Sequence, residues 1–197
     1  METTTHMIFI TGGVRSGKSS FAEKMALEKA ISRDGNLHYI ATGLPSDTEM
    51  NLRIEKHKQQ RHQCNQNWKT WEQSENIGLL ADNFTNKDIL LLDCLTTLLN
   101  NELFSDETAH NKRMIGSILS GIERIRKNCD SLIIVSNEIL NEPLQTNELV
   151  LSYKKMLGHL HQEIVKQSDE AFLVESGVPI LMKGGADERD HDSGNSF

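Results

Sequence analysis

Residues 7–20, Met-Ile-Phe-Ile-Thr-Gly-Gly-Val-Arg-Ser-Gly-Lys-Ser-Ser, join an apolar run to a glycine-rich loop. Gly12, Gly17, Lys18 and Ser19 satisfy the pattern G-x-x-x-x-G-K-[ST], and the apolar run predicts the buried strand that precedes such a loop. Glycines let backbone N–H groups turn toward a polyphosphate, and the next helix presents its N-terminal donors to the same anion. A glycine-rich turn before an amphipathic helix would not require the Lys-Ser pair at this register.

Every residue of this loop is therefore a candidate nucleotide contact. The set is Gly12, Gly13, Val14, Arg15, Ser16, Gly17, Lys18 and Ser19. We expect Lys18 to be exposed and to reach the β- and γ-phosphates, which would make it a catalytic residue of phosphate transfer. The hydroxyl of Ser19 is expected to be a ligand of Mg²⁺.

Composition limits what else the chain can be. Its 197 residues suffice for one α/β domain, which we place at residues 1–183, and the acidic, glycine-rich residues 184–197 predict a disordered tail. A net charge of −7 argues against nucleic-acid binding. The odd, scattered cysteines fit reduced cytosolic thiols. No signal peptide or membrane-spanning apolar run is evident, so we expect a soluble, cytoplasmic protein without a membrane span.

Apolar runs and periodicity predict the secondary structure. Strands are expected at residues 7–10, 37–41, 88–93, 131–136, 171–174 and 179–182, with a strand or extended segment at 68–72 and a hairpin turn at Ser176-Gly177. Helices are expected from the phosphate loop to about residue 33, and at 47–61, 76–84, 107–127 and 147–167, with a loop or helix at 95–104. Strands that alternate with helices predict a three-layer P-loop α/β fold with a mostly parallel sheet.

Asp93 ends the apolar run 88–93, as the acidic residue of a Walker B element does. At the carboxyl end of a buried strand, its carboxylate would hold Mg²⁺ opposite Ser19, directly or through water. A carboxylate at a strand end is often only a helix cap. The phosphate loop makes the magnesium interpretation the stronger one.

His57 lies in a stripe of charged residues on the expected helix 47–61, four residues after Arg53 and four before Arg61. Cations on both sides favour a neutral imidazole near pH 7, and a neutral imidazole is a competent nucleophile toward phosphorus. The same arginines could position phosphate groups. An ordinary solvated helix face gives the same spacing, so spacing alone leaves the choice open.

Several motifs together resemble the bifunctional adenosylcobinamide kinase and adenosylcobinamide-phosphate guanylyltransferase family of cobalamin biosynthesis. The resemblance covers residues 7 to about 183. Its motifs are Thr11-Gly12-Gly13-Val14-Arg15-Ser16-Gly17-Lys18-Ser19, Tyr39-Ile40-Ala41-Thr42, Arg53-Ile54 with His57-Lys58 and Arg61, Trp68-Lys69-Thr70 with Glu72, Leu91-Leu92-Asp93-Cys94-Leu95-Thr96-Thr97, and Asn137-Glu138.

The resemblance implies that His57 accepts GMP from GTP to form a covalent guanylyl-enzyme. It implies nucleotide contacts from the P-loop and from Thr42, Gly43, Leu44, Lys58, Gln59, Gln60, Arg61, Glu72 and Asp93. It further implies ATP or GTP, adenosylcobinamide and adenosylcobinamide phosphate as substrates, Mg²⁺ as cofactor, and a homotrimer.

Two other functions are compatible with the P-loop. The chain could be a monofunctional small-molecule kinase in which His57 contributes only charge. It could instead be a nucleotide-dependent regulatory switch, although no guanine-reading Asn-Lys-x-Asp run is present.

Overall fold

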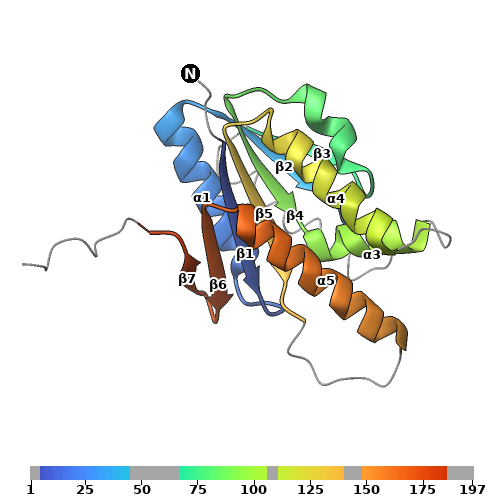
Figure 1. The fold of residues 1–197 in the computed structure, drawn as a ribbon. Helices are drawn as coiled ribbons and strands as arrows, with labels where there is room; N and C mark the ends of the chain where they lie inside the picture. Colours follow the sequence, from blue (N-terminus) through green and yellow to red (C-terminus); the bar gives the residue numbers. More distant parts are fainter. Residues whose placement is uncertain (1–4, 45–66, 106–110, 140–147, 186–197) are drawn as a thin grey trace, which may run out of the picture.

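The computed structural model describes residues 5–44, 67–105, 111–139 and 148–185, which form one seven-stranded sheet with helices on both faces (Figure 1). The strand order is β3-β2-β4-β5-β1-β6-β7. The strands are β1 (His6–Gly12), β2 (Asn36–Ala41), β3 (Trp68–Glu72), β4 (Asp88–Asp93), β5 (Ser131–Asn137), β6 (Glu170–Glu175) and β7 (Val178–Lys183). All neighbouring strands are parallel except β6 and β7, which confirms the prediction of a mostly parallel α/β sheet.

The helices cover the two faces unequally. They are α1 (Lys18–Arg33), the 3-10 helix η1 (Ile77–Asn83), α3 (Leu95–Ser105), α4 (Asn111–Arg126) and α5 (Glu148–Gln167). In the described part of the chain, α1 alone packs on one face through Ala22, Ala26 and Ala30, and the other helices share the opposite core. This arrangement has the three layers that the alternating pattern predicted.

The apolar run of β4 shows why the sheet is central. Ile89 and Leu91 pack in the core shared with α1, whereas Leu90 and Leu92 pack in the opposite core. All four side chains are fully buried. A strand covered on both faces has no polar alternation, which is why its sequence reads as a continuous apolar run.

Most of the predicted elements are present. The segment 76–84 forms a 3-10 helix and not an α-helix, the segment 95–104, expected as a loop or helix, is the helix α3, and the helix expected at 107–127 is described from Asn111. Ser176 and Gly177 form the expected hairpin turn with positive φ angles of 51° and 82°. The expected helix 47–61 and most of the expected tail, residues 186–197, lie outside the described residues.

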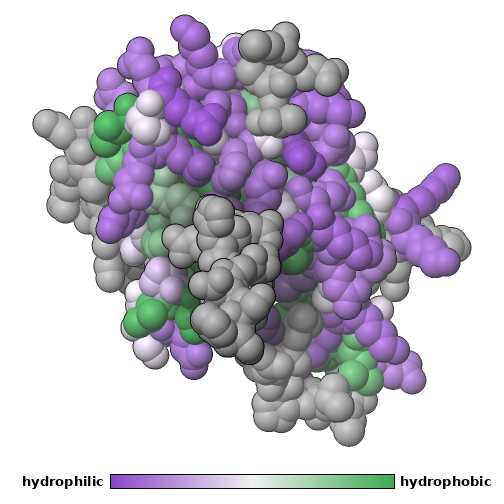
Figure 2. All heavy atoms as spheres, turned by 60° about the vertical axis from the view of Figure 1, so that its left-hand side comes forward, coloured by the Kyte–Doolittle hydropathy of each residue, from purple (hydrophilic) through white to green (hydrophobic). Residues whose placement is uncertain are grey.

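The surface is mainly polar on the face shown in Figure 2, where hydrophobic side chains form only small separate groups. Among the described helices, none combines the length and the apolar character needed to cross a bilayer.

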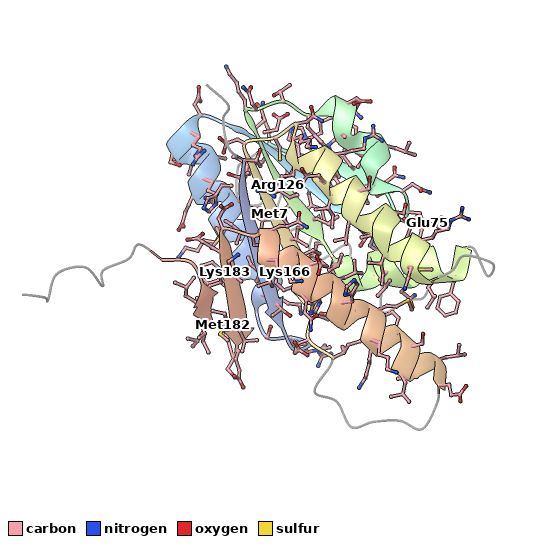
Figure 3. The ribbon with its side chains drawn as sticks, viewed as in Figure 1. Met7, Glu75, Arg126, Lys166, Met182 and Lys183 are labelled. Atoms are coloured by element: carbon pink, nitrogen blue, oxygen red, sulfur yellow. The ribbon has the colours of Figure 1, made fainter. Side chains whose placement is uncertain are left out.

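Lys183 joins the last strand to the end of α5 (Figure 3). Its ammonium donates hydrogen bonds to the carbonyl oxygens of Val165 at 2.8 Å, Lys166 at 3.0 Å and Ser168 at 2.6 Å. The last carbonyls of a helix have no intrahelical donors and carry partial negative charge, so a cation placed there stabilises the helix end. Lys183 therefore fastens the β6–β7 hairpin to the body of the domain.

We expect Lys183→Met to lower the free energy of unfolding by about 1–2 kcal/mol, because three carbonyls, two of them partly buried, lose their donor. Urea unfolding followed by circular dichroism measures this change. Lys166→Met is the matched control: this neighbouring lysine makes only an exposed ion pair with Glu163, so its loss should leave stability close to wild type. An equal change in unfolding free energy in the two variants would contradict a stabilising role for the hydrogen bonds of Lys183.

Candidate functional site

The loop between β1 and α1 has the shape of a phosphate cradle. Arg15 and Gly17 adopt left-handed backbone conformations, with φ angles of 61° and 91°. The N–H of Ser16 donates to the carbonyl of Gly13 at 3.2 Å and closes a tight turn between them. Alternation of right- and left-handed residues gathers successive N–H groups on one side of the backbone, which produces an anion-binding concavity.

Two neighbouring segments hold this loop in place. Glu138, just after β5, donates its N–H to the carbonyl of Gly12 at 2.8 Å, and Gly177 of the hairpin donates to the carbonyl of Ser16 at 2.8 Å. A Cβ at Gly12 would collide with the carbonyl oxygen of Val174 and with Ser16 Oγ. Only glycine therefore allows β6 and the loop to approach this closely.

Lys18 is not exposed as expected, because only 4% of its surface is accessible. Its Nζ donates to the carbonyl of Gly13 at 3.0 Å, so the ammonium lies across the loop. The helix α1 begins without a side-chain cap on Gly17 and without an acidic residue in its first turn. The positive end of the helix and the ammonium therefore act on the same space, and an anionic ligand would be attracted there.

Asp93 lies at the same edge of the sheet, two strands away from β1. With a strand spacing of about 4.8 Å, this separation is roughly 10 Å. Tyr39 of β2 donates its hydroxyl hydrogen to Asp93 Oδ2 at 2.8 Å and so orients the carboxylate. Sequence analysis did not identify this role for Tyr39, because the contact depends on β2 lying beside β4.

Cys94 and Thr42 join the loops that follow β4 and β2. The Thr42 hydroxyl accepts from the Cys94 N–H and donates to the Cys94 carbonyl, both at 2.9 Å, and Thr42 is completely buried. This side chain therefore acts within the protein, and a nucleotide contact in segment 42–44 would fall to Gly43 and Leu44. Burial raises the pKa of Cys94, and Asp93 raises it further while the charge of Lys18 opposes the shift. The thiol stays protonated.

A buried hydrogen-bond chain supports this edge from behind. Asn137 donates its N–H to Thr96 Oγ1 at 2.8 Å, Thr96 Oγ1 lies 3.0 Å from Ser136 Oγ, and Ser136 Oγ lies 2.8 Å from His161 Nε2. Burial lowers the pKa of His161, although Glu138 opposes the shift. A neutral ring can accept the Ser136 hydroxyl hydrogen at Nε2, so the chain is satisfied without a buried charge. Sequence analysis missed it because its members lie on α3, β5 and α5.

The predicted site residues spread along the carboxyl edge of the sheet. The P-loop and Asp93 lie on β1 and β4, whereas Glu72 ends β3 and is exposed, beside the segment 42–44. From β1 to β3 there are four strand spacings, or about 19 Å. The structure therefore brings the P-loop and Asp93 together and places Glu72 at the other end of the same edge.

Six predicted residues belong to the connection between β2 and β3 and lie outside the described residues. They are Arg53, His57, Lys58, Gln59, Gln60 and Arg61.

Comparison with known proteins gives a consistent family over nearly the whole chain. Residues 8–182 match the family described as cobinamide kinase / cobinamide phosphate guanyltransferase. The chain is 33% identical over 178 residues to the bifunctional adenosylcobalamin biosynthesis protein CobP of Pseudomonas aeruginosa, with 89% of this chain and 96% of that protein covered. It is 30% identical over 188 residues to the bifunctional adenosylcobalamin biosynthesis protein CobU of Salmonella typhimurium, with 90% and 99% covered.

Among solved structures, the flagellar accessory protein FlaH from Methanocaldococcus jannaschii is similar with a TM-score of 0.49 and 12% sequence identity. The similarity covers 91% of this chain and 79% of that one.

We expect Lys18→Met to weaken binding of a fluorescent GTP analogue by roughly 10- to 100-fold, because a charge-assisted contact is lost while the buried stem keeps its volume. Fluorescence titration measures the dissociation constant, and thermal unfolding verifies the fold. The control is Lys24→Met on the same helix, where the exposed ammonium makes only a 3.8 Å ion pair with Glu28. A Lys18 variant that binds as tightly as wild type would show that the ammonium does not contact the nucleotide.

We expect stability to fall as the pH drops below about 6.5. Burial lowers the pKa of His161 in the folded state below its ordinary value of 6.5. As the pH falls, the unfolded chain therefore binds a proton at this histidine before the folded chain does, and the proton shifts the equilibrium toward unfolding. Burial also lowers the pKa of His38, which acts in the same direction. Urea midpoints at pH 7.5 and 5.5 measure this loss of stability, which should be smaller in His161→Gln but not absent, because His38 still contributes. A variant that loses as much stability as wild type would show that His161 does not contribute to the pH dependence.

Proposed function

The chain belongs to the cobinamide kinase / cobinamide phosphate guanyltransferase family, and from that membership we propose that it carries out both transfers on one catalytic edge. In the first, ATP or GTP phosphorylates adenosylcobinamide. In the second, GMP passes from GTP to adenosylcobinamide phosphate and gives adenosylcobinamide-GDP. The observation that carries the proposal is the P-loop, whose Lys18 ammonium stands at the open N-terminus of α1 within a family match over residues 8–182.

In the kinase step the P-loop binds the triphosphate. Backbone N–H groups of residues 13–19, apart from that of Ser16, which donates to Gly13, would surround the phosphate oxygens, and Lys18 would compensate their charge. The corrinoid hydroxyl oxygen attacks the γ-phosphorus, the bond to the β-phosphate oxygen breaks, the nucleoside diphosphate leaves and the hydroxyl proton is released. Such transfers depend mainly on positioning and charge compensation, which a rigid cradle provides.

The residues present suit a magnesium ion. Ser19 and Asp93 offer a hydroxyl and a carboxylate oxygen, the hard donors that Mg²⁺ prefers, and Tyr39 already orients the carboxylate. The described residues contain no cluster of three His, Cys, Asp or Glu side chains that could hold a metal by themselves. Ser19 and Asp93 would therefore hold the ion together with the phosphates of the nucleotide. When bound, the ion would neutralise phosphate charge.

For guanylyl transfer we propose that GTP lies along the carboxyl edge of the sheet. The triphosphate would occupy the P-loop, and the base would lie toward the segment 42–44 and Glu72, about 19 Å from β1. The Glu72 carboxylate at the end of β3 can accept hydrogen bonds from the N–H groups of guanine, which adenine lacks at the same positions. Lys58, Gln59, Gln60 and Arg61 complete the binding residues that the family resemblance implies.

The nucleophile of this step is His57. One imidazole nitrogen attacks the α-phosphorus of GTP, pyrophosphate leaves, and a P–N bond to the guanylyl group forms. A phosphate oxygen of adenosylcobinamide phosphate then attacks the same phosphorus, and the P–N bond breaks to restore the histidine. Arg53 and Arg61, one turn to either side on the predicted helix, position the phosphate oxygens. The family resemblance and this spacing support the assignment.

The cytoplasmic location and the homotrimer stay predictions. The family resemblance supports the trimer, and the burial of Cys94 and Cys129 without a disulfide between them fits a cytoplasmic enzyme.

We expect incubation with α-labelled GTP and magnesium to label the wild-type protein through a bond that survives alkali and is lost in acid, as a P–N bond does. His57→Asn should abolish the label and spare phosphorylation of adenosylcobinamide, because that phosphate passes directly from nucleotide to substrate.

The matched control is His62→Asn in the same connection, which should keep the label. Full labelling of the His57 variant would move the nucleophile elsewhere, and its loss in the His62 variant would identify that residue. A wild-type protein that phosphorylates the corrinoid but never becomes labelled would be a monofunctional kinase.

A further inference from the structure

Three buried side-chain oxygens near the carboxyl ends of β1 and β5 have no hydrogen-bond partner among the described residues. They are Thr11 Oγ1 on β1, Ser16 Oγ in the loop and Asn137 Oδ1 at the end of β5. Buried polar groups in folded proteins nearly always have a partner, since an unsatisfied one costs about 1–3 kcal/mol. Ser16 and Asn137 lie on the face of the sheet that carries α1, beside the P-loop, whereas Thr11, two residues after Phe9, faces the opposite core. The oxygens of Ser16 and Asn137 therefore point to a polar ligand that completes their hydrogen bonds.

Asn137 faces the same side of the sheet as Lys18. Side chains alternate along a strand, and Ile133 and Val135 of β5 pack in the core that contains α1. Asn137, two residues further on, lies on that side too. Its register partner on β1 is Gly12, and the side of Gly12 where a Cβ would point is filled by Ser16 Oγ. The amide therefore stands beside the P-loop.

The position of β5 in the sheet places this amide between the two halves of the phosphate site. β5 lies between β1, which leads into the P-loop, and β4, which ends at Asp93. In a P-loop the lysine reaches the β- and γ-phosphates, and the Walker B carboxylate holds the Mg²⁺ that bridges them. A side chain between the two would lie near the γ-phosphate.

The neighbours of the amide leave one of its ends available. Asn137 Nδ2 lies 4.0 Å from Cys94 Sγ, which itself lies 3.0 Å from Thr97 Oγ1. The Cys94 thiol is protonated and can donate a weak hydrogen bond. Rotation of the amide group by half a turn exchanges the positions of Oδ1 and Nδ2. Oδ1 then accepts a hydrogen bond from the thiol, and the Nδ2 group donates from the position where Oδ1 lacks a partner. Asn137 can thus donate to an anion while it keeps its contact with Cys94.

We propose that Asn137 is a catalytic residue of the kinase step, in which its side-chain amide donates a hydrogen bond to the γ-phosphate in the P-loop. That this step is the phosphorylation of adenosylcobinamide rests on the proposed function, whereas the contact between Asn137 and a γ-phosphate does not. The amide neither gains nor loses a proton. It stabilises the negative charge on the γ-phosphate oxygens while the bond to the β-phosphate oxygen breaks and the bond to the corrinoid oxygen forms. Guanylyl transfer takes place at the α-phosphorus and should depend on Asn137 much less.

Asn137→Ala and Asn137→Asp test this contact. We expect kinase turnover with adenosylcobinamide to fall on the order of 100-fold in both, because one donor to a developing charge is lost. Labelling by α-labelled GTP should continue. The preference for a non-hydrolysable GTP analogue over GDP should narrow about tenfold in Asn137→Ala, since only the triphosphate carries the group that Asn137 contacts. Thermal unfolding with GDP bound verifies the fold.

The matched control is Asn128→Ala at the opposite edge of the sheet, where a half-buried amide donates only to the Arg124 carbonyl at 2.9 Å. It should change neither turnover nor nucleotide preference. Folded Asn137 variants that keep wild-type kinase turnover and the wild-type preference for the GTP analogue over GDP would overturn the inference. Variants that lose kinase turnover and labelling by α-labelled GTP to the same extent would also overturn it. A wild-type protein without kinase activity would instead contradict the proposed function, and the nucleotide preference would still decide the role of Asn137.

Discussion

The absence of a side chain at Gly12 is the constraint on which the site depends. At this residue the carbonyl oxygen of Val174 and the hydroxyl of Ser16 occupy the space of a Cβ, and the carbonyl of Gly12 itself accepts from Glu138. Because β1 is fixed on both sides at the point where it becomes the P-loop, the loop has little freedom to take another path. The path of the loop in turn sets the positions of Lys18 and of the first turn of α1, which come directly after it. The cradle is thus preorganised by backbone contacts and needs little rearrangement to receive a polyphosphate.

The parallel sheet explains how one small domain can serve two transfers. In parallel strands all carboxyl ends share an edge, so groups that act on different phosphates of one nucleotide can be arranged along it. Here the groups proposed to act on the terminal phosphate lie on β1, β5 and β4, and Glu72 lies at the end of β3. The connection that carries His57 joins β2 to β3, at the Glu72 end of the sheet. Separation of the two chemistries along the edge fits a protein in which one step can be removed by substitution without the other.

Much of this could be predicted from sequence because the signals are local. The P-loop pattern, the apolar run that ends at Asp93 and the helical periods each lie within one element, and within the described residues the structure has strands and helices at these places. What could not be predicted depends on which strands become neighbours. The bond from Tyr39 to Asp93 and the placement of Asn137 between β1 and β4 require the order of the sheet. Lys18 was expected to be exposed because its carbonyl partner and the surrounding strands cannot be inferred from the loop pattern alone.

The hydrogen bond from Gly177 to Ser16 has a consequence for the growing polypeptide. β1 is synthesised first, yet its neighbours β5 and β6 come from the second half of the chain, and the N–H of Met7 bonds to Asp169 Oδ2 at 2.7 Å across 162 residues. Contacts of such long sequence separation form late, because much of the chain must close into a loop first. On the ribosome, the P-loop therefore has both of its backbone supports, from Glu138 and Gly177, only after the β6–β7 hairpin has emerged. A nascent chain that lacks this hairpin therefore lacks one of the two contacts that hold the cradle in shape.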